Sequence, residues 1–140
     1  MKNKLIIYIS LCSLFQFSFL AGSGTVPIVS SPTGSNFTEG LSVANITTNS
    51  AVFSYLAGGT QITEHGVVYG KSAQPALGSG NRVTYYIGTA KNVPPTKTFF
   101  KVSASRLEAS TKYYARAYIK DSSGNIVYGN EVSFTTLRAK

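Results

Sequence analysis

The feature that most constrains the fold is the C-terminal segment of residues 106–136, where apolar and polar residues alternate on both sides of a polar turn. Before the turn, alternate positions carry Tyr113, Ala115, Ala117 and Ile119. After the turn, they carry Ile126, Tyr128, Val132 and Phe134. This is the period of a strand with one buried face, and Gly124-Asn125 tolerates the positive φ of a tight turn. The segment therefore predicts a β-hairpin.

Five further strands are predicted upstream, because short alternating runs are separated by turn residues. They cover residues 41–46, 51–56, 63–71, 82–87 and 98–104. Beyond the N-terminal apolar run, no stretch has the apolar spacing of an amphipathic helix. The pattern predicts one all-β domain over residues 41–136, an antiparallel seven-stranded β-sandwich. Residues 137–140 form a tail.

A structural corner is predicted just before the last two strands. The residues concerned are Leu107, Thr111 and Tyr113. In β-sandwich domains, a tyrosine at this corner bonds its hydroxyl to the backbone a few residues upstream. We therefore expect Tyr113 to fasten the corner.

The first 23 residues have the pattern of a secretory signal peptide. Lys2 and Lys4 precede an apolar run, and the small residues Ala21-Gly22-Ser23 follow it. We expect cleavage after Ser23 and an exported protein, extracellular or in the cell envelope. The alternative is an uncleaved anchor, although the run is shorter and more polar than a spanning helix requires. Ser23 stands where a bacterial lipobox has its lipid-bearing cysteine, so we expect no direct lipid anchor.

The cysteine content and charge exclude several kinds of site. Cys12, the only cysteine, lies in the expected signal peptide, so neither disulfides nor cysteine-based metal sites are expected in the exported chain. Without Lys2 and Lys4, 11 basic residues face five acidic ones. The basic residues are scattered singly, whereas nucleic-acid binding requires a denser track. We interpret the basic net charge as one that keeps the exported protein soluble. Neither a nucleic-acid partner nor a cofactor is expected.

No catalytic site is predicted. Glu64 and His65 form the only adjacent acid–imidazole pair, but neighbours on a strand point to opposite faces. We expect them to be an exposed strand pair that does not meet in one site. The five carboxylates show no spacing for a paired acid–base site, and a lone histidine leaves little for a metal site. The chain is therefore expected to be neither an enzyme nor a metalloprotein.

Several motifs resemble those of fibronectin type III domains. The run from Leu107 through Thr111 and Tyr113 to Arg116-Ala117 resembles the general signature. Three further stretches are similar to fibronectin type III-like modules of Bacteroidetes surface proteins: TEHGVVY at 63–69, YYARAY at 113–118 and YGNEVSFTT at 128–136.

The resemblance covers residues 41–136. It departs from the usual pattern at Ala109, where a proline is common, and at His65, where an arginine is common. The resemblance implies a β-sandwich of the fibronectin type III or immunoglobulin-like class. It also implies a bacterial secreted or surface module that serves as a spacer or an adhesion unit.

The best candidate for binding is the polar face of the strand around residue 116. It carries Tyr114, Arg116, Tyr118 and Lys120. Exposed tyrosine and arginine are typical anchors of interfaces. The predicted function is a non-catalytic secreted or cell-surface interaction module for a protein or glycan partner. The alternative for this face is that it is partly covered or merely solvated.

A second functional hypothesis concerns residues 24–40. Their Pro, Gly, Ser and Thr content predicts a flexible spacer, but Val26, Ile28 and Val29 could form a short strand. Added to the open sheet edge of a neighbour, that strand would build an extracellular filament or an envelope complex. The partner would then be a second copy or a membrane protein.

Overall fold

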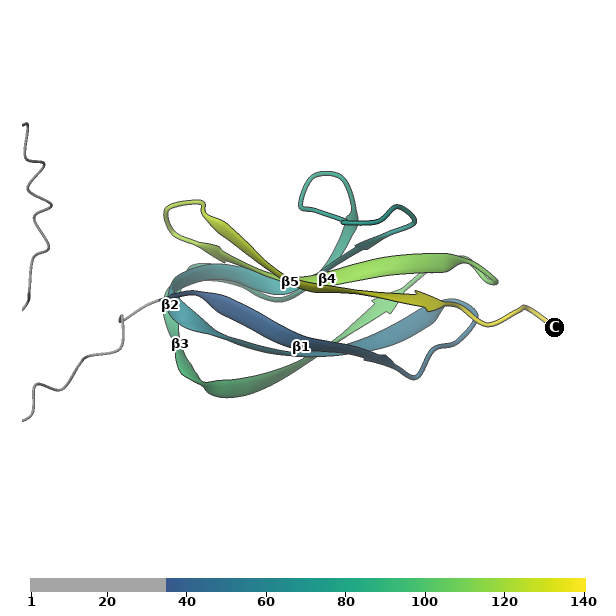
Figure 1. The fold of residues 1–140 in the computed structure, drawn as a ribbon, viewed down its shortest axis with the longest axis horizontal. Helices are drawn as coiled ribbons and strands as arrows, with labels where there is room; N and C mark the ends of the chain where they lie inside the picture. Colours follow the sequence, from purple (N-terminus) through teal and green to yellow (C-terminus); the bar gives the residue numbers. More distant parts are fainter. Residues whose placement is uncertain (1–34) are drawn as a thin grey trace, which may run out of the picture. The chain divides into compact units, whose positions relative to one another are not determined.

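The computed structural model describes residues 35–140, except for the side chains of residues 95–97. This part of the chain is all-β, and its strands are β1 (Phe37–Ala44), β2 (Ser50–Gly70), β3 (Asn81–Ser105), β4 (Lys112–Asp121) and β5 (Ile126–Thr135) (Figure 1). The predicted signal peptide, Ser23 and the strand residues Val26, Ile28 and Val29 lie outside the described residues. Within residues 35–140, no helix is long and apolar enough to cross a bilayer.

Two long strands bend so that each takes part in both layers of an antiparallel β-sandwich. Residues 50–57 of β2 pair with β1 on one side and with residues 98–105 of β3 on the other. The register shifts around Gly59 and Ile62. Beyond them, β2 pairs with the first part of β3 and with β4, which pairs with β5. One layer is therefore β1–β2–β3, and the other is β3–β2–β4–β5 (Figure 1).

The predicted count of seven strands is wrong, because four of the predicted strands merge in pairs. Residues 51–56 and 63–71 fall almost entirely within β2, and residues 82–87 and 98–104 both fall within β3. Register irregularities bend a strand without ending it, so the turn-like residues between these segments do not interrupt the ladder.

The first strand also begins earlier than predicted, at Phe37. The Asn36 side chain accepts a hydrogen bond from the Thr60 N–H at 2.9 Å. This contact holds the start of β1 against the bend of β2.

The core lies between the two layers, and it includes the apolar face predicted for residues 113–119. The strands and the corner contribute alternate residues to it. They contribute Ala51, Phe53, Tyr55, Phe100, Val102, Ala104, Leu107, Tyr113, Ala115, Ala117, Ile119 and Phe134. The Phe134 ring packs between those of Phe53 and Tyr113, with centroid distances of 5.6 and 5.7 Å. Aromatic rings of this size contribute much of the buried apolar area in a small domain.

The predicted face of the last strand is only half right. Val132 and Phe134 face the core, but Ile126 and Tyr128 face outward. Tyr118 pairs with Tyr128, whereas Arg116 pairs with Glu131, so β5 has one residue more than β4 in this interval. An inserted residue moves the following side chains to the other face of the sheet.

The predicted tyrosine corner is confirmed. The Tyr113 hydroxyl accepts a hydrogen bond from the Glu108 N–H at 3.0 Å, and Leu107 is buried in the core. The Thr111 N–H donates to the hydroxyl of Thr136 at 2.9 Å. The corner therefore ties the beginning of β4 to the end of β5.

Replacing Tyr113 by phenylalanine is expected to lower the free energy of unfolding by about 1–2 kcal/mol, because the Glu108 N–H loses its acceptor. Urea unfolding measures the change. Tyr85→Phe is the matched control, since within residues 35–140 no hydrogen bond of its hydroxyl is found, and it should change stability by less than about 0.5 kcal/mol. Equal effects of the two substitutions would show that the corner bond does not stabilise the fold.

His65 lies inside the core, so its prediction as part of an exposed strand pair is wrong. Its side chain is fully buried, and Nδ1 lies 2.9 Å from the Tyr55 hydroxyl. The rings of Phe100 and Tyr85 pack against it, with centroid distances of 4.5 and 5.3 Å. Within residues 35–140, Nε2 has no hydrogen-bond partner. Burial, with a smaller effect from Lys91, lowers the pKa of His65 from 6.5 to about 4.

The buried imidazole predicts a loss of stability in a defined pH window. The unfolded chain takes up a proton at His65 near pH 6.5, and the folded protein does so only near pH 4. Stability should therefore fall as the pH decreases through this window, by up to about 3 kcal/mol. Urea unfolding at a series of pH values measures this loss.

His65→Gln is the control for the pH series, because glutamine cannot titrate. The free energy of unfolding of this variant should decrease less than that of the natural protein over the same window. Parallel curves for the two proteins would show that His65 is not the group responsible.

Candidate functional site

The connection between β2 and β3, residues 71–80, folds over the outer face of β4 and β5, and we call it the strap. Two side chains of β5 hold it in place. The Tyr128 hydroxyl accepts a hydrogen bond from the Leu77 N–H at 2.9 Å. A carboxylate oxygen of Glu131 accepts one from the Gln74 N–H. The outward turn of Tyr128 at the β5 bulge therefore supplies one of the two attachment points.

The strap also makes apolar contact with β2. Pro75, a residue of the strap itself, is buried. A Cβ atom at Gly80 would lie 3.1 Å from Cγ2 of Val68 and 2.9 Å from the carbonyl oxygen of Tyr69. Glycine is therefore required for the strap to lie this close to the sheet.

Tyr118 is fully buried, so its predicted place on an exposed binding face is wrong. Tyr118 and Val68 both have no exposed surface, yet neither belongs to the core between the layers. On the outer side of the sheet, Tyr118 forms a small buried cluster with Glu64. The alternative that the face is partly covered is correct for its centre.

Glu64 completes the buried cluster. The Tyr118 hydroxyl donates to Oε1 of Glu64 at 2.5 Å, and Nη1 of Arg82 lies 3.0 Å from the same oxygen. Burial, followed by the hydrogen bond to Glu64, raises the pKa of Tyr118 above its usual value. The Glu64 side chain is only 7% exposed, so its prediction as an exposed residue is wrong too. The Glu64 carboxylate is therefore held by two partners on the outer side of the sheet.

The remaining residues of the predicted face stay accessible. Tyr114, Arg116 and Lys120 are half-buried. The Arg116 guanidinium lies 4.6 Å from the centroid of the Tyr128 ring, and its Nε donates to the Gly129 carbonyl at 3.3 Å.

A second cation–ring pair lies nearby, where Nζ of Lys112 is 5.1 Å from the centroid of the Tyr114 ring. We define the β4–β5 face by the residues Tyr114, Arg116, Lys120, Tyr128 and Ser133. The two cation–ring pairs hold aromatic and basic groups in defined positions on paired strands.

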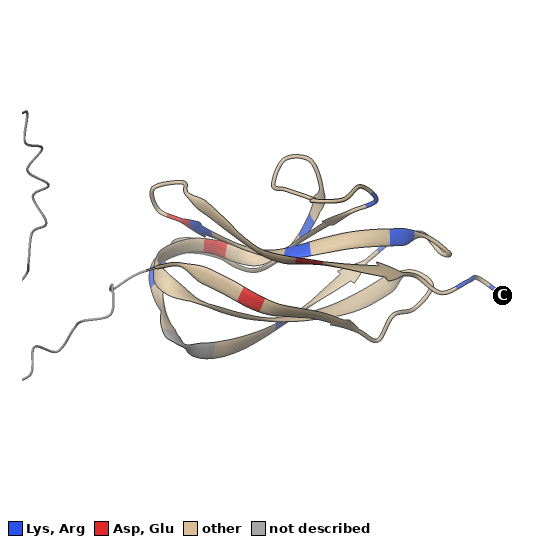
Figure 2. Ribbon diagram, in the orientation of Figure 1, with Lys and Arg blue, Asp and Glu red and all other residues tan. Residues whose placement is uncertain are grey.

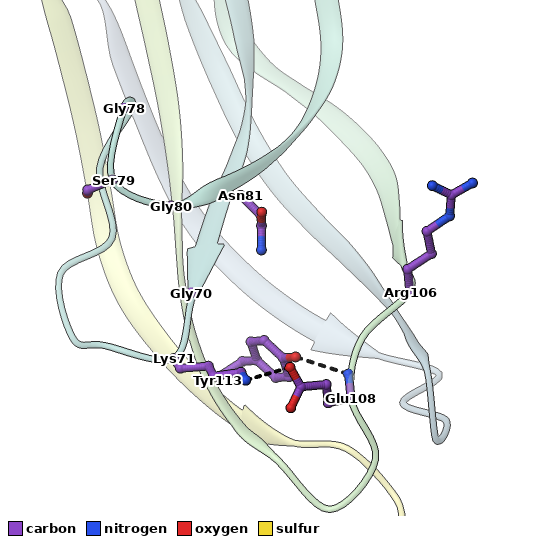
Figure 3. Close-up of a pocket in the computed structure, with 9 residues that line it drawn as sticks. All are labelled: Gly70, Lys71, Gly78, Ser79, Gly80, Asn81, Arg106, Glu108 and Tyr113. Carbon is purple, nitrogen blue, oxygen red and sulfur yellow. Dashed lines mark hydrogen bonds and ion pairs between the residues drawn. The ribbon is translucent and has the colours of Figure 1, made fainter.

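A polar hollow of about 500 Å³ lies beside the tyrosine corner, between the strap and the end of β3. Figure 3 shows Nζ of Lys71 paired with Glu108, at 2.5 Å, and Arg106 extending away from this pair. Asn81 and Tyr113 also line the hollow. Since its basic and acidic groups neutralise each other and Arg106 points elsewhere, the hollow does not focus donors on one ligand atom.

Glu64 and His65, which are adjacent in the sequence, lie in different surroundings. Glu64 hydrogen-bonds to Tyr118 on the outer side of β2, whereas His65 contacts Tyr55 between the layers. In residues 35–140, no group of three or more His, Cys, Asp or Glu residues is placed to hold a metal ion.

No protein-family model matches the chain, and neither does any curated protein. Several solved structures are similar. The sensor domain of the anti-sigma factor RsgI4 from Pseudobacteroides cellulosolvens has a TM-score of 0.52 at 12% identity, covering 74% of this chain and 96% of that one. A computationally redesigned β-sandwich protein has a TM-score of 0.50 at 18% identity, covering 75% and 96%.

The FN1–FN3 domains of chicken CNTN1 are also similar, with a TM-score of 0.50 and 16% identity. The match covers 76% of this chain and 33% of that one. Identities at this level establish the fold and carry no statement about partners. The described part of the chain therefore has a fibronectin type III-like β-sandwich fold.

Proposed function

We propose that this protein is an exported, non-catalytic interaction module that binds a protein or glycan partner at the bacterial cell surface through the β4–β5 face. Its fold supports the proposal, since fibronectin type III-like domains typically serve as interaction modules. The signal-peptide pattern of residues 1–23 supports export.

The observation that carries the proposal is the pair of cation–ring contacts on the β4–β5 face. Arginine and tyrosine are the residues most enriched among interface anchors. Here Arg116 is held by the Tyr128 ring and by the Gly129 carbonyl, and Tyr128 is itself held by the strap. Side chains already fixed in position lose less conformational entropy when a partner binds.

Crosslinking from the β4–β5 face tests the proposal. After removal of the expected signal peptide, the chain has no cysteine, so one introduced thiol can carry a photoreactive group. Ser133→Cys places it on the exposed side of β5, beside Tyr114. We expect a discrete crosslinked product on the surface of the producing cell. Ala44→Cys, on the exposed side of β1, is the matched control and should give no such product.

Substitution then identifies the anchors. Tyr114→Ala and Arg116→Ala should each weaken binding to the crosslinked partner at least about tenfold, without changing the unfolding midpoint appreciably. Tyr118→Ala should instead unfold the domain or weaken its stability, because Tyr118 is buried. Products of equal yield from both thiol positions, or unchanged binding by the two variants, would overturn the proposal.

A further inference from the structure

The long strand β3 provides a free sheet edge. Among the strands within residues 35–140, β3 pairs with β2 alone. Seven consecutive pairs, from Leu56 with Phe99 to Ser50 with Ser105, show no register shift. A regular edge presents a row of backbone donors and acceptors that another strand can use. Residues 99–105 therefore form a suitable acceptor for an added strand, and we call them the β3 edge.

Basic residues accompany the β3 edge without acidic ones. By its sequence, β3 contains Arg82, Lys91, Lys97 and Lys101 and has no aspartate or glutamate. Figure 2 accordingly shows no acidic residue on the part of β3 that it colours. The sequence has no acidic residue between Glu64 and Glu108. Lys101 is exposed on the β3 edge, and it takes part in neither of the two ion pairs found within residues 35–140. The charge of the edge is therefore available to an acidic partner.

An aromatic residue adjoins Lys101 on the solvent side of the edge. Phe99 is 58% exposed, and Nζ of Lys101 lies 5.7 Å from the centroid of its ring. A side chain of an added strand at this position would contact the apolar Phe99 ring and the cationic Lys101 ammonium group. A carboxylate with a short aliphatic stem, as in glutamate, suits both.

The inner side of the same edge requires different chemistry. Tyr85 is 52% exposed, and its ring packs against Phe100 and His65, with centroid distances of 4.6 and 5.3 Å. These contacts place Tyr85 at the open flank between the two layers. Side chains of an added strand alternate between its faces, so those that point inward would meet Tyr85 and should be apolar.

We propose that the β3 edge binds an extended acidic segment of a partner protein, whose carboxylates alternate with apolar side chains, as an added antiparallel or parallel strand. Charge complementarity selects this occupant. A second copy of β3 would bring like charges together across the pair, which is unfavourable. Residues 24–34 of this chain carry no charge, so they would leave Lys101 without a counterion. This proposal is independent of the β4–β5 face.

The probe is a fluorescein-labelled peptide of alternating glutamate and valine, about eight residues long so that it spans the edge. Fluorescence anisotropy with the exported protein should show saturable binding, and the lysine–valine analogue should not bind. Hydrogen exchange should slow at residues 99–105 and not in β1 or β5. Two N-methylated peptides, one methylated at every valine and one at every glutamate, separate strand addition from charge attraction. Only one of them should lose binding, because alternate residues direct their N–H groups to the same side.

Charge reversal gives a matched pair of variants. Lys101→Glu should weaken the binding of the glutamate–valine peptide at least about tenfold. Lys112→Glu makes the same change of charge on β4, a strand that is paired on both sides. This substitution should weaken the binding of the peptide less than about twofold.

Four outcomes would overturn the proposal. The first is that both N-methylated peptides bind as well as the parent, which means charge attraction only. The second is equal weakening by Lys101→Glu and Lys112→Glu. The third is tighter binding of a peptide with the sequence of residues 24–34, which would indicate strand exchange between copies. The fourth is binding of polygalacturonate, an acidic polysaccharide, without binding of the peptide. Crosslinking from Ser133→Cys should be unaffected by the peptide, so failure here is distinguishable from failure of the β4–β5 face.

Discussion

The hydrogen bonding of β2 on both of its sides is the constraint on which the rest of the domain depends. Its first part pairs with β1 and β3, and its last part pairs with β3 and β4. The bend near Gly59 and Ile62 transfers the strand from one layer to the other. Because β2 supplies residues to both layers, the two sheets are covalently and cooperatively linked, and the core between them closes around Phe53, Tyr55 and Val67.

The same strand determines which surfaces are left for partners. Its outward side chain Glu64 accepts the hydrogen bond of the buried Tyr118 hydroxyl, and Val68 lies near Gly80 of the strap. This covers the centre of β4 and leaves Tyr114 and Arg116 accessible. The opposite flank of β2 is occupied by β3, whose far side is a free edge. The binding surfaces proposed above therefore lie on opposite sides of the strand that organises the fold.

The sequence predicted the buried faces and the tyrosine corner because both depend on local alternation and on contacts close along the chain. Tyr113 and Glu108 are five residues apart, for example. It did not predict the burial of Tyr118, since its hydroxyl contacts Glu64, which is 54 residues away along the chain. The outward turn of Tyr128 follows from one inserted residue, which strict alternation cannot reveal. The burial of His65 depends on Tyr85 and Phe100, again from a distant strand segment.

The central claim is that Tyr118 is buried beside Glu64, whereas Tyr114 is part of a surface that a partner covers. Hydroxyl-radical footprinting, with peptide mass spectrometry, tests it on the purified protein and on the surface of the producing cell. The account predicts that Tyr118 is unmodified in both states, whereas Tyr114 is modified in the purified protein and protected on the cell. Modification of Tyr118 in the purified protein, or equal modification of Tyr114 in the two states, would contradict it.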